Sequence, residues 1–202
     1  MGFSGHLVFG RSTQPLLAAP VFDDLHQEVK DTIRPWKARP GWWQTLELDN
    51  GLWESDYLRE LVAWTNAPAC VANVNDSDMA LIAGLDPVGR EWQACLNLET
   101  AASLLAAEPQ DMDDLSLWVG SPGFHEAVQR KRAELVEEVP RSAEAALAWA
   151  AAAGITPSSR SGIEAVLLSH DTFAENLFPA LLDALGFPAP IDDTIENMSQ
   201  TA

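Results

Sequence analysis

Polar side chains at alternate positions of three predicted strands are the residues of this chain best suited to recognition chemistry. Strand by strand they are Trp43, Thr45 and Glu47; Asn73 and Asn75; and Glu91, Gln93 and Asn97. Alternate residues of a strand point to the same face of a sheet. Amides and carboxylates around a tryptophan offer hydrogen bonds and an aromatic anchor, as partner-binding surfaces do. The same pattern is also typical of the solvent-exposed face of an antiparallel sheet.

Catalytic motifs are weak by comparison. The stretch SHDT at 169–172 has the residue types of a hydrolase triad, but successive residues of a helix point about 100° apart and cannot relay a proton among themselves. The chain has four histidines, none of them at a metal-ligand spacing: His6, His26, His125 and His170. We therefore predict no metal and no cofactor, and the sequence does not establish that any reaction is catalysed.

Net charge is the strongest global signal. Twelve Lys and Arg against 30 Asp and Glu give −18 at pH 7. Such a chain is expected to repel nucleic acid and anionic membrane surfaces and to attract a basic protein. Surplus carboxylates can also serve only to keep a protein soluble, so charge alone does not select a function.

A three-stranded meander over 69–98 must position most of these polar residues. Its strands, ACVANVND, DMALIAGLD and REWQACLNL, are joined by the turn-prone segments NDSD and DPVG. Alternation places Cys70 and Cys95 on opposite faces, so we predict two free thiols. An earlier strand, GWWQTLELDNG, is expected to send Trp42 into the core with Leu46 and Leu48, and Trp43 to the polar face.

Helices are expected before and after these strands in the sequence. The spacing of Val21, Leu25, Val29 and Ile33 predicts a helix that Pro35 ends. From residue 98 onward the pattern is helical, and Pro179 is expected to break or kink the last helix. We predict one domain over 1–187, sheet-rich in 1–98 and helical in 99–187, followed by a disordered acidic tail at 188–202.

Two further groups of residues could bind a ligand. A pocket between the sheet and the C-terminal helices would be lined by Trp92, Trp118 and Trp149, although tryptophans at such positions are usually core. The loop RPWKARPG gathers basic residues around Trp36, which could bind an anion or simply pack.

These patterns predict an α+β protein with a mainly antiparallel sheet, helices on one face and an all-helical C-terminal third. Its nine Arg and three Lys suggest a bacterial source, and the first ten residues resemble no secretory signal, so we expect a cytoplasmic protein. The favoured function is a non-enzymatic module, immunity-like or regulatory, that binds a basic protein through the polar sheet face. The alternative is a small-molecule-binding protein or enzyme with the tryptophan-lined pocket.

Overall fold

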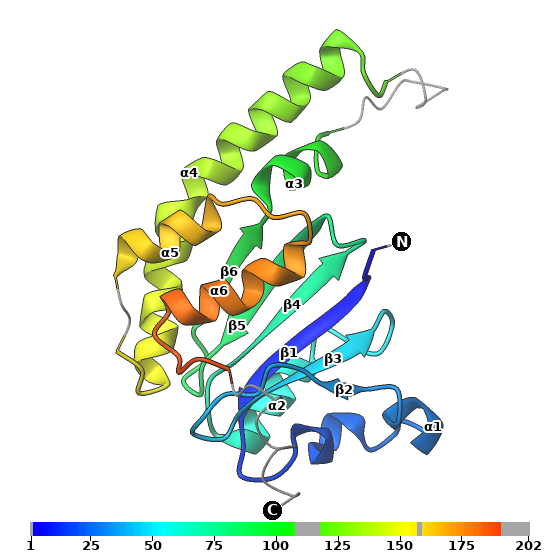
Figure 1. The fold of residues 1–202 in the computed structure, drawn as a ribbon, viewed down its shortest axis with the longest axis vertical. Helices are drawn as coiled ribbons and strands as arrows, with labels where there is room; N and C mark the ends of the chain where they lie inside the picture. The colour runs from blue at the N-terminus through cyan, green and yellow to red at the C-terminus, as the bar shows by residue number, and fades with distance from the viewer. Residues whose placement is uncertain (1, 108–117, 157–158, 191–202) are drawn as a thin grey trace, which may run out of the picture.

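A six-stranded antiparallel sheet is the centre of the protein. The computed structural model describes residues 2–107, 118–156 and 159–190. The strands lie in the order β2-β3-β1-β4-β5-β6 (Figure 1). Their bounds are β1 Gly5–Arg11, β2 Arg34–Pro35, β3 Trp43–Asp49, β4 Ala69–Asn75, β5 Met79–Leu85 and β6 Glu91–Leu96.

The predicted meander is confirmed as β4, β5 and β6. Its second turn is fixed by the carboxylate of Asp86, which accepts hydrogen bonds from the backbone N–H groups of Val88 and Arg90, both at 3.0 Å. These bonds and the Arg90 guanidinium hold the pKa of Asp86 below its usual range, although burial acts in the opposite direction. Cys70 and Cys95 are free thiols on opposite faces, as predicted.

Helices complete the expected α+β class. The α-helices are α1 Gln27–Lys30, α2 Tyr57–Thr65, α3 Leu98–Leu104, α4 Pro122–Ala152, α5 Arg160–Leu167 and α6 Leu177–Ala184. Short 3-10 helices are η1 Leu16–Ala18, η2 Pro20–Phe22 and η4 Ala174–Asn176. The helical C-terminal third is therefore confirmed.

Helices cover one face of the sheet and part of the other. The helices α4, α5 and α6 pack against one face, where Phe9, Trp43 and Trp92 belong to the larger hydrophobic cluster (Figure 1). On the other face η1, η2 and α2 cover β1 and β3, and Val8 and Leu48 are in a second, smaller cluster. Because β1 is a central strand covered on both sides, its residues are buried whichever face they point to, and six of the seven are buried.

Two predictions in the first fifty residues are wrong. The helix expected over Val21 to Ile33 is replaced by η2 and the single turn α1, because His26 takes an extended backbone (ψ 149) between them. Val21 and Ile33 are nevertheless buried. Trp42 does not join the core, since it is 62% exposed and lies outside β3 with φ at 68°.

Proline positions in the C-terminal third also differ from expectation. Helix α4 continues through Pro140 for 31 residues, because buried side chains such as Val139 and Ala143 hold both halves. Pro179 is in the first turn of α6, where its missing N–H costs no helical hydrogen bond. The chain breaks instead between α5 and η4, so SHDT lies in a loop.

Arg39, in the basic loop before β3, is a structural residue. Its side chain is fully buried and its terminal nitrogens contact Asp183 at 2.6 Å, the carbonyl of Pro179 at 3.0 Å and that of Pro188 at 2.8 Å. The Lys37 ammonium lies 4.5 Å from the ring centroid of Trp36. Arg39 therefore fastens α6 to the sheet and does not face an external anion.

Candidate functional site

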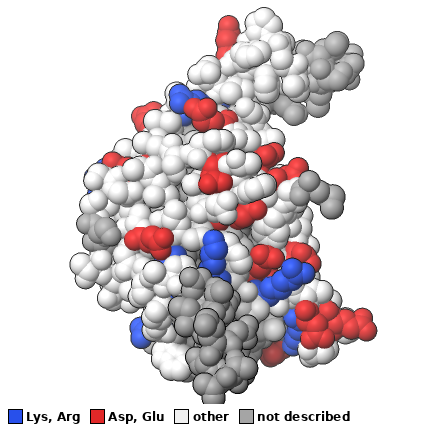
Figure 2. Space-filling model, viewed as in Figure 1, with Lys and Arg blue, Asp and Glu red and all other residues white. Residues whose placement is uncertain are grey.

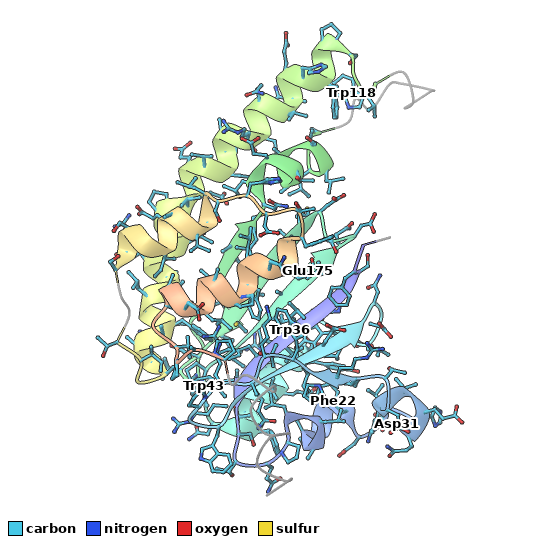
Figure 3. The ribbon with its side chains drawn as sticks, in the orientation of Figure 1. Phe22, Asp31, Trp36, Trp43, Trp118 and Glu175 are labelled. Carbon is cyan, nitrogen blue, oxygen red and sulfur yellow. The ribbon has the colours of Figure 1, made fainter. Side chains whose placement is uncertain are left out.

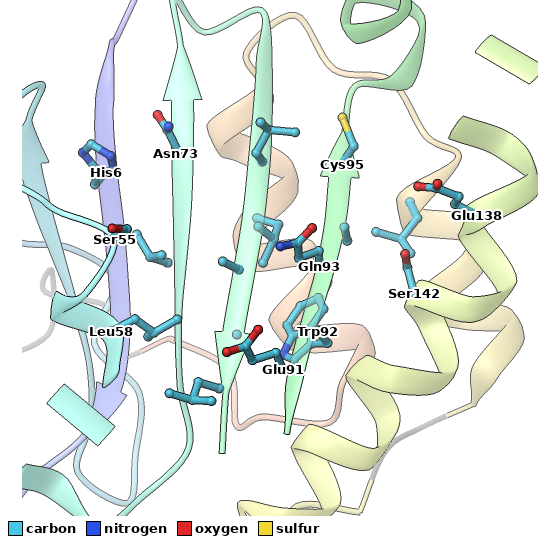
Figure 4. A pocket seen from close by; sticks show the side chains of 18 of the residues that line it. His6, Ser55, Leu58, Asn73, Glu91, Trp92, Gln93, Cys95, Glu138 and Ser142 are labelled. Atoms are coloured by element: carbon cyan, nitrogen blue, oxygen red, sulfur yellow. The ribbon is translucent and has the colours of Figure 1, made fainter. Parts of the chain in front are cut away.

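A groove crosses the half of the second sheet face that η1, η2 and α2 leave uncovered. Its volume is about 650 Å³, and its floor is formed by β4, β5 and β6 together with His6 of β1. One wall is the start of α2 and the segment before it, with Leu58 and Ser55, and the other is α4, with Glu138 and Ser142 (Figure 4). The groove therefore lies between two helices on the face opposite α6.

Two rows of paired strand residues make the floor. His6 pairs with Asn73, Asn73 with Leu81, and Leu81 with Cys95, so these four side chains lie side by side on one face. The next row is Val71, Ala83 and Gln93. Asn73 and Gln93 are exposed, and Leu81 is 44% exposed between them. The floor is thus an apolar strip with amides beside it.

The walls of the groove make it acidic. Asp56, Glu91 and Glu138 line it together with a single arginine, Arg59, giving the lining a formal charge of −2. The Arg59 guanidinium lies 3.3 Å from the Glu91 carboxylate, and both side chains are mostly exposed. Such an exposed pair contributes little to stability, so either residue can take a new partner at little cost in free energy.

His6 is the buried polar group of this floor. It is 7% exposed, and its Nδ1 makes no hydrogen bond with any residue that the structure describes. Burial lowers the pKa of His6, because the charged imidazolium loses hydration. A neutral imidazole is therefore expected at neutral pH.

The row from His6 to Cys95 has the residue types of a cysteine nucleophile with its base, but not the geometry. Three strand spacings, about 14 Å, separate the two backbones, whereas a nucleophile and its base must lie within hydrogen-bond reach. Burial raises the pKa of the Cys95 thiol to about 12. A protonated, distant thiol is a poor nucleophile, so this row is better suited to binding than to covalent catalysis.

The predicted polar face is divided between the two sides of the sheet. Asn73, Asn75, Glu91 and Gln93 do share the exposed face, and all of these except Asn75 line the groove. Thr45 pairs with Phe9, and Phe9 with Cys70, so Trp43, Thr45 and Glu47 lie on the opposite face.

Trp43 and Asn97 are structural residues instead. Trp43 is 3% exposed and its ring lies 5.0 Å from that of Phe9 and 4.8 Å from that of Phe187. Asn97 is 1% exposed in the left-handed region just before α3. Its amide donates to the carbonyls of Asp78 at 2.7 Å and Asp171 at 3.0 Å, tying the loop after α5 to the sheet.

The alternative tryptophan pocket is not formed by its three predicted residues. Trp92 and Trp149 pack together at 5.6 Å, and the Trp149 indole donates to the carbonyls of Ala69 and Leu85. Trp118 lies at the distant end of α4 against Phe124 (Figure 3). Of the three, Trp92 alone also lines the groove.

Sequence reasoning missed the groove walls. Arg59 and Glu138 come from helices, and a helical periodicity does not tell which strands a helix borders. His6 has a usable signal in the sequence, since it alternates with the apolar Leu7 on a strand, but metal-ligand spacing among the histidines does not reveal it.

Comparison of this chain with known protein families, curated proteins and solved structures finds no significant match. In the described ranges no group of three or more His, Cys, Asp and Glu is placed to hold a metal ion. Among the described helices, none is both long and apolar enough to cross a bilayer.

Proposed function

We propose that the protein is a non-enzymatic binding module that takes up a basic segment of a protein partner in the groove over β4, β5 and β6. The observation that carries this proposal is the combination of an uncovered sheet face with a lining charge of −2. Elsewhere both faces of the sheet are covered by helices, so this exposed strip is the natural place for a partner.

The dimensions and chemistry of the groove fit a lysine or arginine side chain. The aliphatic stem of such a residue can lie on Leu81 and Ala83, while its charged head meets Glu91 or Glu138. Amides at Asn73 and Gln93 can bond the partner's backbone. A volume of about 650 Å³ admits only a few residues, so the rest of the partner would contact the rim.

The charge of the whole molecule supports the same partner. On the side where α5 and α6 lie, opposite the groove, carboxylates predominate, with Lys and Arg among them (Figure 2). A net charge of −18 accelerates encounter with a basic protein, while the groove supplies the specific contacts. The free thiols Cys70 and Cys95 are compatible with a reducing compartment, and we propose a cytoplasmic location.

Capture from an extract of the cells that make the protein tests this proposal. The immobilised wild-type chain is compared with a double variant, Glu91→Lys and Glu138→Lys, at about 50 and 300 mM salt. The matched control carries Glu28→Lys and Glu126→Lys, the same change of net charge at exposed positions outside the groove. Bound proteins are identified by mass spectrometry.

We expect the wild type and the control to recover the same basic protein, more at low salt, and the groove variant to lose it. Equal losses in both variants would assign binding to overall charge and remove the groove from the proposal. A third variant, Leu81→Gln, leaves the charge unchanged, and undiminished capture by it would show that the floor is not used. Recovery of no basic protein at 50 mM salt would reject the module and leave the small-molecule alternative.

A further inference from the structure

A second pocket lies at another end of the sheet, where β1 ends and α2 ends. Its volume is about 420 Å³. Residues 12–14 after β1 form one side, and residues 65–67 at the end of α2 form another. The pocket also includes Arg11, Trp42 and Trp64. It shares no lining residue with the groove, so its function is independent of the proposed partner site.

Trp42 is the unusual residue of this pocket. It follows Gly41 with a second consecutive positive φ, 68°, a conformation that large side chains rarely adopt. Its side chain is 62% exposed, so core packing does not compensate for the strain. A glycine would fit this backbone more easily, and strained, exposed residues of this kind concentrate at functional sites.

Hydrogen bonds between the surrounding segments hold the walls of the pocket. The Gln44 side chain accepts from the N–H of Leu16 at 3.0 Å and donates to the carbonyls of Ser12 and Gln14, both at 2.8 Å. The N–H of Ser12 in turn donates to the carbonyl of Trp42 at 3.1 Å. A preformed pocket loses little entropy when a ligand binds.

Arg11 gives this pocket a charge opposite to that of the groove. Its Nε donates to the carbonyl of Gly41 at 3.1 Å, and its guanidinium carbon lies 5.9 Å from the ring centroid of Trp43. In a chain with 30 acidic residues, none of the described residues lining this pocket is Asp or Glu. A held guanidinium beside the exposed Trp42 and the half-buried Trp64 suits a ligand that combines an anionic group with a flat ring.

We propose that this pocket binds a small anion carrying a flat ring, an aryl carboxylate or a nucleotide. The anionic group pairs with Arg11, and the ring lies against Trp42 and Trp64. Hydroxyl and amide groups of Thr13, Gln14 and Asn66 are available for the polar edge of the ligand. A volume of about 420 Å³ lies within the range of small-molecule pockets.

Titration followed by ¹H–¹⁵N spectra of the eight tryptophan indoles tests this proposal. The probes are benzoate, adenosine 5′-monophosphate, adenosine and inorganic phosphate, with Trp42→Phe and Trp64→Phe assigning the two signals. We expect benzoate, adenosine 5′-monophosphate or both to shift these two indoles saturably, and adenosine and phosphate to bind at least about 10-fold more weakly. The anion that binds more tightly shows whether the ligand is an aryl carboxylate, represented by benzoate, or a nucleotide, represented by adenosine 5′-monophosphate.

Two variants separate binding from folding. Arg11→Gln should lower the affinity for the ring-bearing anion about 10-fold or more. Arg59→Gln, a matched change in the groove, should leave that affinity unchanged. Trp42→Gly should remove binding while unfolding at the same or a higher urea concentration, because the backbone strain is relieved. The proposal is overturned if neither anion shifts the Trp42 and Trp64 signals saturably, or if Arg11→Gln or Trp42→Gly binds as well as wild type.

Discussion

Replacing Arg39 by methionine is the most informative test of how the helical layer is held on the sheet. The guanidinium donates from Nη1 and Nη2 to the Asp183 carboxylate and to the carbonyls of Pro179, Phe187 and Pro188, at 2.6 to 3.4 Å. Its Nε makes no hydrogen bond within the described ranges, so these contacts are what the variant loses.

The expected cost follows from which acceptors can regain water. The Asp183 side chain is 55% exposed and Pro188 is exposed, so both can be hydrated after the change. The carbonyl of Pro179 lies within α6, where a helical N–H can still reach it, whereas the carbonyl of the buried Phe187 is left unsatisfied at a cost of about 1–3 kcal/mol. Because methionine largely replaces the packing of the stem, this bond and the contact with Asp183 are the main losses, and we expect Arg39→Met to lower the free energy of unfolding by about 2–4 kcal/mol.

Urea denaturation followed by circular dichroism measures this loss. Lys37→Met is the matched control, because it removes one positive charge from the same loop at an exposed position. Its cation–π contact with Trp36 is worth about 0.5–1 kcal/mol. An Arg39→Met variant that loses less than about 1 kcal/mol, or no more than Lys37→Met, would refute the view that buried carbonyls depend on Arg39.

Three further predictions concern single positions. Pro140→Ala should raise the free energy of unfolding by up to about 3 kcal/mol in urea melts, since it restores an N–H inside α4; an unchanged or lower value would mean that the helix has adapted to proline. Gly84→Ala should destabilise the protein by about 1–3 kcal/mol or more, because a methyl group there would overlap the Trp92 indole; a neutral result in the same melts would contradict this packing. Stability should also fall between pH 7.5 and 5.5, because the lowered pKa of His6 lets the unfolded chain take up a proton first. Urea melts at both pH values should show a smaller fall for His6→Gln, and an equal fall would exclude His6 as the cause.

Local patterns in the sequence were enough for the sheet meander and the helical C-terminal third. The period of two in 69–98, with turn residues between the strands, predicted three antiparallel strands and the opposite faces of Cys70 and Cys95. The start of α4 also has a local cause, because the Ser121 hydroxyl accepts from the N–H of Phe124 at 3.1 Å.

The candidate sites depended on contacts that no local pattern contains. Alternation shows which residues of one strand share a face with Trp43, and which residues of another share a face with Asn73. It does not show whether these two faces are the same side of the sheet. The pairing of both strands with β1 decides this, and it places Trp43 and Asn73 on opposite sides. The groove exists because α4 and the segment before α2 border strands distant in sequence.

Turn geometry and proline positions were decided in the same way. Trp42 lies outside the core because the turn before β3 has a left-handed backbone at this residue. Helix α4 continues through Pro140 because apolar side chains of the helix are buried both before and after the proline. The sequence by itself therefore determined β3 to β6, the helical character of the C-terminal third and the charge of this protein. The tertiary structure alone decided which side chains face one another, because burial of large apolar surfaces outweighs local preferences of about 1–3 kcal/mol.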